Sequence, residues 1–292
     1  MLTRARYGTS SGTLNYEQDI FQFVKSGQVQ VHREDLERLS DHMVHLADGT
    51  ALRVDALVLS TGFSAKPAVA FEPAASHADL GLPSTEYTAA QQALWAELDE
   101  KADLAIAAQF PRLLRGPFEG PASAAPKPYH AGMAAEVPYT PWRLYRGVAP
   151  PGLAARGDRS LVFLGMFSNV ANTIRLEVQC LWALAYMTDR LPGLRADDPV
   201  AAKGVLAETA LFQRYTRHRS PFGHGPFFPD LVFDQLPYWD LLLNDLGLPT
   251  RRKANAFREL FEAYSQEDYK GLVQEWTRLT WERTGQAWAM PE

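Results

Sequence analysis

Two short apolar runs, each followed by a small-residue turn, are the segments in which the backbone could approach a ligand. The first is Ala56–Leu59, preceded by Asp55 and followed by Ser-Thr-Gly-Phe at positions 60–63. An uninterrupted apolar run of this length is typical of a strand that is buried on both faces of a parallel sheet. Glycine at its end lets the backbone approach a ligand closely, because no Cβ stands in the way. We therefore predict a buried strand that ends at a binding turn.

The second run is Leu161–Leu164, which ends at Gly165. It is also predicted to be a buried strand. After a short loop, Asn172 or Thr173 can cap a helix whose body, residues 174–186, is apolar almost all round. This helix should be largely buried.

Side chains for other kinds of chemistry are few. The single cysteine, Cys180, lies among apolar neighbours and is predicted to be a buried, inert thiol, and its being alone excludes internal disulfides and cysteine-based zinc sites. His218 and His224 could be metal ligands, but no carboxylate lies at a convincing spacing, so ordinary loop histidines are favoured. No Gly-x-Ser-x-Gly turn offers a hydrolase nucleophile.

The elements expected around these runs are short strands followed by helices. Gln28–His32 alternates as a half-buried strand does, and residues 43–46 and 51–54 flank an Asp-Gly turn typical of a hairpin. The proline- and aromatic-rich residues 111–151 are predicted to be a long packed loop of the kind that binds ligands. Helices are expected at 15–25, from a cap at Ser84 or Thr85 to Pro111, and at 238–246, 253–265 and 268–283.

Composition narrows the class of protein. At 292 residues, with 46% apolar and 22% charged residues, the chain is expected to be a soluble globular protein of one large or two ordinary domains. Its net charge of −5 argues against nucleic acid as a partner, and Arg251–Lys253, the one basic cluster, is expected on a solvated helix start. No apolar run is long enough to span a membrane and no secretory leader is evident, so the cytoplasm is the expected location.

The hairpin and the first run together resemble flavin-containing monooxygenases. In that family a strand ending in Ala-Thr-Gly closes the nicotinamide domain, and here Ser60 stands where alanine is usual. Residues 163–187 resemble the unit that closes the FAD domain, in which a helix N-terminus faces the flavin ring. The implied fold class is α/β, a partial flavoprotein with two dinucleotide-binding domains. Its parts would be the tail of the NADP domain (1–63), a return into the FAD domain (64–190) and a helical C-terminal extension (191–292).

The resemblance implies an oxidoreductase that uses FAD and NADPH. Such enzymes oxygenate a small organic substrate, an amine, a sulfide or a ketone, through a flavin peroxide, so the chemistry belongs mainly to the cofactor. It assigns no catalytic side chain. The positions expected to bind the cofactor are Ser60, Thr61, Gly62, Phe63, Gly165, Met166, Asn172 and Thr173.

The chain departs from this family in one large respect. It contains no Gly-x-Gly-x-x-Gly turn, the motif that binds the pyrophosphate of each dinucleotide. The matched motifs all belong to the C-terminal half of a whole enzyme, so the isolated chain is expected to bind FAD poorly and to be inactive. One alternative is a non-catalytic subunit that complements a partner chain carrying the missing strands. Another is a small binding protein that holds an apolar ligand beside Trp142 and Tyr145.

Overall fold

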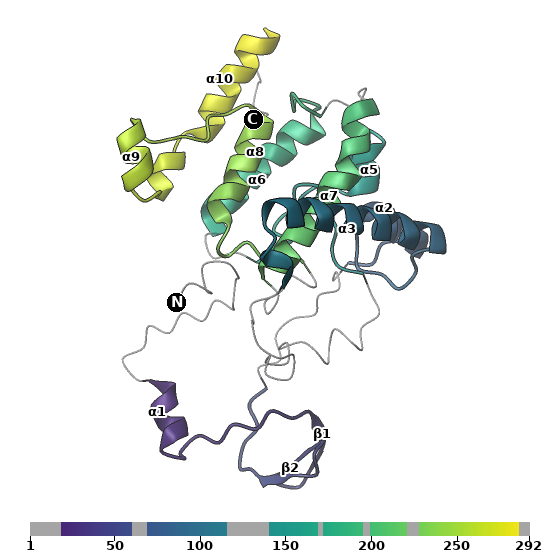
Figure 1. Cartoon of the computed structure of the whole chain (residues 1–292), viewed down its shortest axis with the longest axis vertical. Helices are drawn as coiled ribbons and strands as arrows, with labels where there is room; N and C mark the ends of the chain where they lie inside the picture. Colours follow the sequence, from purple (N-terminus) through teal and green to yellow (C-terminus); the bar gives the residue numbers. More distant parts are fainter. Residues whose placement is uncertain are drawn as a thin grey trace. The chain divides into compact units, whose positions relative to one another are not determined.

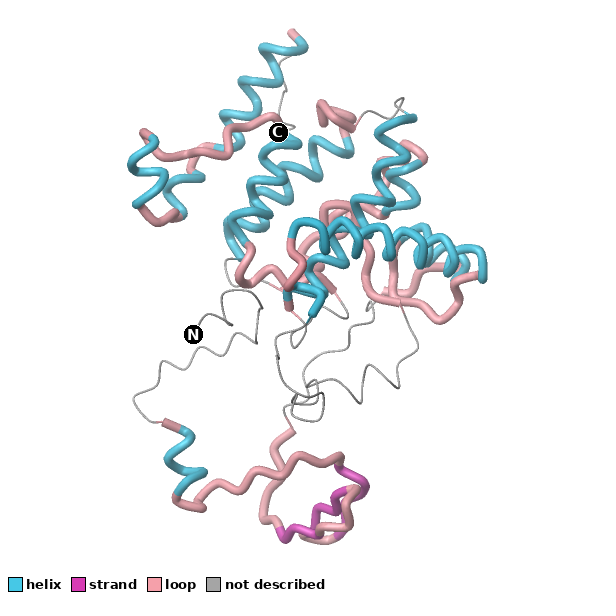
Figure 2. The backbone as a smooth tube through the Cα atoms, in the orientation of Figure 1, coloured by secondary structure: helices cyan, strands magenta, loops and turns pink. Residues whose placement is uncertain are grey.

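The computed structural model describes residues 19–59, 69–115, 140–168, 172–194, 199–220 and 228–285. The chain divides into two compact units, one of residues 12–64 and the other of residues 1–11 and 65–292. Within the described ranges, every strand belongs to the smaller unit and forms one antiparallel sheet, whereas the larger unit is helical (Figure 2). The chain is thus a mixed α/β protein. The expected pair of dinucleotide-binding domains and the boundaries at 63 and 190 stay predictions.

The smaller unit holds one short helix and a three-stranded meander. Helix α1 (Ile20–Lys25) begins at Asp19, whose side chain accepts a hydrogen bond from the Phe21 backbone. The sheet order is β1-β2-β3, and the central strand supplies the two buried residues Val44 and Leu46. The strands are β1 (Leu36–Ser40), β2 (Met43–Leu46) and β3 (Ala51–Arg53). The hairpin predicted around Asp48-Gly49 is confirmed, and strand β1 was not foreseen.

Two strands predicted in this unit are wrong. Residues 28–32 form a turn and an extended segment without a sheet partner. The run at 56–59 is not a strand either, and it is exposed rather than buried, with Val58 at 89% and Leu59 at 69% exposure. A strand buried on both faces needs neighbours on both edges and a layer over each face. The described part of this unit offers β3 and no parallel strand beside it, so the apolar pattern had nothing to fold against.

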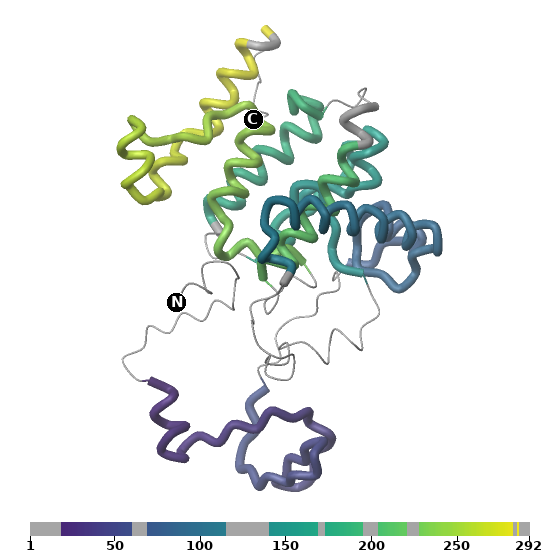
Figure 3. The backbone as a smooth tube through the Cα atoms, in the orientation of Figure 1, coloured from purple at the N-terminus to yellow at the C-terminus, as the bar shows by residue number. Residues whose placement is uncertain are grey.

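The larger unit is built from helices that pack in pairs. Helix α3 lies against α7 although the two are far apart in the sequence, α6 lies against α8, and α5 contacts both α2 and α7 (Figures 1 and 3). Its elements in chain order are η1 (Ala74–Ser76), α2 (His77–Leu80), α3 (Ala89–Gln109), η2 (Leu113–Arg115), α5 (Pro151–Ala155), α6 (Asn172–Met187), α7 (Pro199–Arg219), α8 (Gln235–Leu246), α9 (Ala256–Phe261), η4 (Gln266–Tyr269) and α10 (Leu272–Thr284).

Helix α3 begins later than the sequence suggested. Its N-cap is Thr88, whose hydroxyl accepts from the Gln91 backbone while the Gln91 side chain accepts from the Thr88 backbone. This reciprocal pair satisfies two N–H groups that the first turn would otherwise leave free. Ser84, one of the two expected caps, is buried and accepts instead from the Glu86 backbone. The predicted end before Pro111 is confirmed.

The main core forms between α6 and α8. Trp182 stacks on Tyr186 with ring centroids 5.2 Å apart, and both side chains are fully buried. From α8, Trp239 and Leu243 pack into the same cluster, and Trp276 of α10 joins it. The prediction that the helix at 174–186 is largely buried is confirmed. Cys180, however, is exposed, because it lies on the face of α6 that turns away from α8.

The C-terminal helices differ from the prediction in length and in the role of their basic residues. The helix expected at 253–265 is reduced to α9, and the one expected from 268 becomes η4 followed by α10. Arg252 and Lys253 are not on a solvated helix start. Their side chains are 9% and 5% exposed, and they form ion pairs with Glu275 at 2.9 Å and Asp268 at 2.9 Å respectively. These pairs fix the 250–253 turn against η4 and α10. Across the described residues, no helix is both long and apolar enough to cross a membrane.

An acidic residue of α3 joins it to α7 and gives a test by pH. Asp103 Oδ1 accepts from Arg214 Nε at 2.8 Å and lies 2.8 Å from His218 Nε2, and Oδ2 accepts from Arg214 Nη2. Burial alone would raise the pKa of Asp103, but the hydrogen bonds from Arg214 and His218 outweigh it and lower the pKa below 3.8. The ionised carboxylate therefore stabilises the fold fully above pH 3.8, and this contribution is lost as the pH falls through the lower folded-state pKa.

We expect Asp103→Asn to lower the free energy of unfolding at pH 7, and the gap to the unsubstituted protein to narrow progressively below about pH 4. Urea unfolding followed by circular dichroism between pH 2.5 and pH 7 measures this gap. Glu100→Gln, at an exposed position on the same helix, is the matched control and should leave the curve unchanged. A gap that stays constant down to pH 2.5 would show that the Asp103 charge does not stabilise the contact between α3 and α7.

Candidate functional site

The residues expected to bind a cofactor fall partly within the described chain. Ser60, Thr61, Gly62 and Phe63 lie outside the described residues, so that half of the predicted site is untested. The other half is the Gly165–Met166 turn and the start of α6, where Asn172 is the first helical residue and Thr173 is exposed. Both belong to the larger unit.

The segment before this turn is not the strand that was predicted. Residues 161–164 run extended and half-exposed, and the Phe163 backbone donates one hydrogen bond of 2.8 Å to the Val148 carbonyl. The side chains explain the segment's position: Phe163 packs edge-on against Trp142 and Phe71, with both centroid distances at 5.6 Å. Aromatic packing therefore holds the segment where sheet pairing was expected. The same contacts bury Trp142 to 2% exposure, so its indole belongs to the core.

A chain of buried hydrogen bonds fixes the Gly165 turn to α6 and α8. The Gly165 backbone donates to Gln179 Oε1 at 3.0 Å, and Gln179 Nε2 donates to the Tyr238 hydroxyl at 2.8 Å. Tyr238 in turn donates to the Arg146 carbonyl at 2.8 Å. Burial raises the pKa of Tyr238 above its usual value, so the hydroxyl stays protonated and remains a donor. Gly165 has a φ of +77°, a conformation that favours glycine.

Ion pairs of Arg146 stabilise the end of this chain of hydrogen bonds. Asp245 of α8 accepts from Arg146 Nε at 2.8 Å and from Trp182 Nε1 at 2.9 Å, and Glu208 lies 2.6 Å from Arg146 Nη1. Burial alone would lower the pKa of Arg146, but the hydrogen bond to Asp245 outweighs it and raises the pKa. The arginine therefore stays charged and joins the 145–149 turn to α6, α7 and α8.

Arg175, in the first turn of α6, is a charged side chain beside the Gly165 turn. Its Nη1 donates to the Phe167 carbonyl at 3.3 Å, and its guanidinium lies 5.1 Å from the Phe167 ring centroid. A Cβ built on Gly165 would stand 3.8 Å from Arg175 Nη2. Nε of Arg175 is buried and has no hydrogen-bond partner among the described residues. Burial lowers the pKa of Arg175, the effect expected for a cation held partly out of water.

The segment before α8 pairs with the chain just after the Gly165 turn. The backbones of Ser168 and Asp230 form a short parallel bridge, in which Ser168 donates to the Pro229 carbonyl and the Leu231 N–H donates to the Ser168 carbonyl, each at 2.9 Å. This bridge ties the loop before α6 to the loop before α8.

The start of α6 and the Gly165 turn meet some of the requirements of a flavin site. A positive helix start with Arg175 beside it fits the electron-rich pyrimidine end of a flavin ring. The Gly165 N–H does not remain available, because Gln179 already accepts from it. The described residues also contain no strand, glycine-rich turn and helix in succession, the unit that binds a dinucleotide pyrophosphate. The residues present thus fit one end of FAD.

Sequence reasoning missed Arg175, Tyr238 and Arg146. The signal available was Gln179, a polar residue within an almost wholly apolar helix, because a buried amide needs partners. The turn at Arg146 could not be located from its own sequence. Within the described part of the chain, no group of three His, Cys, Asp or Glu side chains is arranged to hold a metal ion, and His218 is placed by Asp103 and Arg214.

Comparison with known proteins supplies the relationship. The chain is 32% identical over 259 residues to the FAD-dependent monooxygenase DEP4 of Fusarium langsethiae, which covers 88% of this chain and 41% of that protein. It is 31% identical to the FAD-dependent monooxygenase rstn6 of Aspergillus nomiae, over 88% of this chain and 41% of the relative. It is 32% identical to the FAD-dependent monooxygenase resA of Aspergillus sclerotiorum, over 88% and 42%.

Neither a family model nor a solved structure matches the chain. The chain spans about two fifths of the length of the curated relatives that it matches. The similarity to these relatives covers most of this chain. It is consistent with the resemblance to flavin-containing monooxygenases that residues 56–63 and 163–187 show. Over most of its own length, this chain is therefore similar to FAD-dependent monooxygenases.

Proposed function

We propose that this chain forms the C-terminal part of an FAD- and NADPH-dependent monooxygenase that oxygenates a small organic substrate. Its relatives are named FAD-dependent monooxygenases and are more than twice as long. In the larger unit, the Gly165 turn, Arg175 and the start of α6 would face the flavin ring. The segment that binds the pyrophosphates and the nicotinamide would be contributed by the remainder of the enzyme.

The observation that carries this proposal is the exposure of the 57–59 run. Leu57, Val58 and Leu59 are 42%, 89% and 69% exposed, although their sequence is that of a strand buried on both faces. Burying such side chains fully is worth about 1.5–3 kcal/mol each. A complete nicotinamide domain would supply the parallel strands that this run lacks, and pairing with them would bring the Ser60–Phe63 turn to a sheet edge.

The roles of this chain's own residues follow from the site. FAD, when bound, would supply the redox chemistry with oxygen and NADPH. Arg175 and the first N–H groups of α6 would orient the ring by its carbonyl oxygens. Gln179, Tyr238 and Arg146 would position the Gly165 turn without contacting the cofactor. No described side chain is assigned as a proton donor or acceptor in the reaction.

Flavin binding by the purified chain tests the site. We expect weak FAD binding, with a Kd above about 10 µM, because the pyrophosphate contacts are missing. Arg175→Gln should weaken it at least threefold further, whereas Arg278→Gln, on the C-terminal helix α10, should not. Quenching of FAD fluorescence, with the visible spectrum recorded in parallel, measures both. Tight stoichiometric binding would contradict the assignment of this chain to one part of the site.

The upstream sequence tests the identity of the whole enzyme. We expect the transcript to extend before Met1 and to encode two Gly-x-Gly-x-x-Gly turns. The extended protein should bind FAD and oxidise NADPH. A transcript that starts at Met1, with no such coding segment elsewhere at the locus, would overturn the proposal.

The second candidate is a non-catalytic subunit that complements a partner chain, and the same exposed run favours it. A strand without neighbours can be completed by strands from another polypeptide as well as by strands of its own. The two functions are distinguished by the oligomeric state of the native protein. A stable hetero-complex in which this chain keeps its own terminus at Met1 would favour the subunit, and a single longer polypeptide would favour the enzyme.

A further inference from the structure

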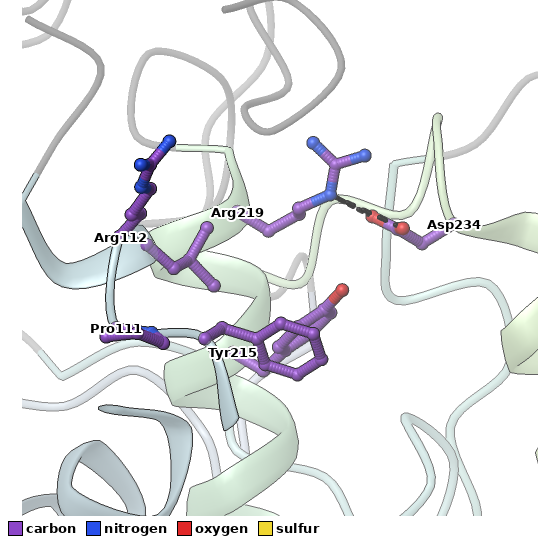
Figure 4. Close-up of a pocket in the computed structure, with 7 residues that line it drawn as sticks. Pro111, Arg112, Tyr215, Arg219 and Asp234 are labelled. Atoms are coloured by element: carbon purple, nitrogen blue, oxygen red, sulfur yellow. Dashed lines mark hydrogen bonds and ion pairs between the residues drawn. The ribbon is translucent and has the colours of Figure 1, made fainter. Parts of the chain in front are cut away.

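The larger unit contains a cavity of about 440 Å³ that is separate from the Gly165 turn. It lies where the end of α3 and η2 meet the last turns of α7 and the residue before α8 (Figure 4). This volume is in the usual range for pockets that bind small molecules. Its described lining residues are Phe110, Pro111, Arg112, Leu113, Tyr215, Arg219 and Asp234.

One part of the cavity is apolar and aromatic. The rings of Phe110 and Tyr215 lie 6.0 Å apart at an interplanar angle of 57°. Leu113 is 8% exposed and packs with Ile106, and Tyr215 packs against both, so this wall is part of a small apolar cluster. Phe110 remains 50% exposed, so its ring is accessible to a molecule in the cavity. A flat apolar body would cover this ring and fill the space beside it.

The other part carries an incompletely satisfied cation. Arg219 Nε lies 3.0 Å from Asp234 Oδ2, and the two side chains are 13% and 15% exposed. In Figure 4 the two terminal nitrogens of Arg219 point away from Asp234. Nη1 is buried and has no hydrogen-bond partner among the described residues. A buried donor without an acceptor is unfavourable, so an acceptor at this end of the cavity would stabilise the protein.

The charges around Arg219 favour an anion over a cation. Burial raises the pKa of Asp234, and Arg219 beside it partly offsets this rise. A ligand cation would compete with Arg219 for the same carboxylate. A ligand carboxylate would instead meet the side of the guanidinium that does not face Asp234, and the planar fork of that group matches two carboxylate oxygens.

We propose that this cavity is a binding site for a small aromatic carboxylic acid. The ring would lie against Phe110 and Tyr215, and the carboxylate would accept hydrogen bonds from Arg219. All the residues that line this cavity belong to this chain, so ligand binding there does not depend on bound flavin or on the proposed monooxygenase activity.

Three compounds that share one ring and differ only in charge test the proposal. 3-Phenylpropionate, 3-phenylpropionamide and 3-phenylpropylamine are titrated into the full chain at pH 7 by isothermal titration calorimetry. We expect the carboxylate to bind at least tenfold more tightly than the amide, which corresponds to about 1.4 kcal/mol, and the amine to bind weakest. Equal binding of acid and amide, tighter binding of the amine, or no binding of the acid up to 10 mM would each overturn the proposal.

Two variants identify the cavity as the place of binding. Arg219→Gln should remove the preference for acid over amide, whereas Arg156→Gln, at an exposed arginine that pairs with Asp79, should keep it. Phe110 is half-exposed, so the fold should tolerate Phe110→Ala. This substitution should weaken binding of the acid and of the amide by the same factor, about three to tenfold. Circular dichroism checks that each variant is folded. Acid binding that survives Phe110→Ala unchanged would place the ligand elsewhere.

Discussion

Gly81→Ala is expected to destabilise the larger unit by more than about 3 kcal/mol. Gly81 ends helix α2 with a φ of +68°, a region in which a side chain costs about 1–2 kcal/mol. The larger effect is steric. A Cβ at this position would stand 1.8 Å from the Arg143 carbonyl oxygen and 3.0 Å from Pro151 Cδ. Because the clash is with backbone, relief requires α2 and the 140–145 segment to move apart.

That movement would also break the 2.9 Å hydrogen bond from the Arg143 backbone to the Gly81 carbonyl. Urea unfolding monitored by tryptophan fluorescence measures the loss. Gly285→Ala is the matched control: this residue also ends a helix with positive φ, at +65°, but a Cβ there meets nothing within 4 Å. It should cost about 1 kcal/mol. Equal losses at the two positions would mean that the close approach of Gly81 and Arg143 does not exist in solution.

Gln179→Leu is expected to lower the free energy of unfolding by about 2–4 kcal/mol. Leucine keeps the volume of the side chain but leaves two buried groups without a partner, the Gly165 N–H and, as an acceptor, the Tyr238 hydroxyl. Tyr238→Phe interrupts the same chain of hydrogen bonds at a later point and should cost about 1–2 kcal/mol. Denaturant unfolding with an unchanged m value would show that the folded state is otherwise intact.

Glu177→Gln provides the control on the same helix, since Glu177 is exposed and its substitution should change stability by less than about 0.5 kcal/mol. In the proposed enzyme, Gln179→Leu should also weaken flavin binding, because the Gly165 turn would lose its anchor on α6. A Gln179→Leu protein as stable as the unsubstituted chain would show that the turn is held by other contacts.

Local sequence signals determined much of this protein. The Asp-Gly hairpin, the end of α3 before Pro111 and the position of α6 each depend on residues close together in the chain. Turn-forming pairs, a proline that cannot continue a helix and an apolar periodicity act over a few residues. The relationship to flavin monooxygenases was also present in the sequence, in the Ser-Thr-Gly turn after residue 59 and in the segment around α6.

Tertiary structure alone decided the rest. An apolar run becomes a buried strand only when neighbouring strands exist, and neither residues 56–59 nor residues 161–164 have them among the described elements. Aromatic contacts place the second run instead, and the first stays exposed. The hydrogen bonds from Gly165 through Gln179 and Tyr238 to Arg146, and the cavity around Arg219, join residues far apart in the chain. Their distances depend on how α3, η2, α6, α7 and α8 pack, which no local pattern specifies.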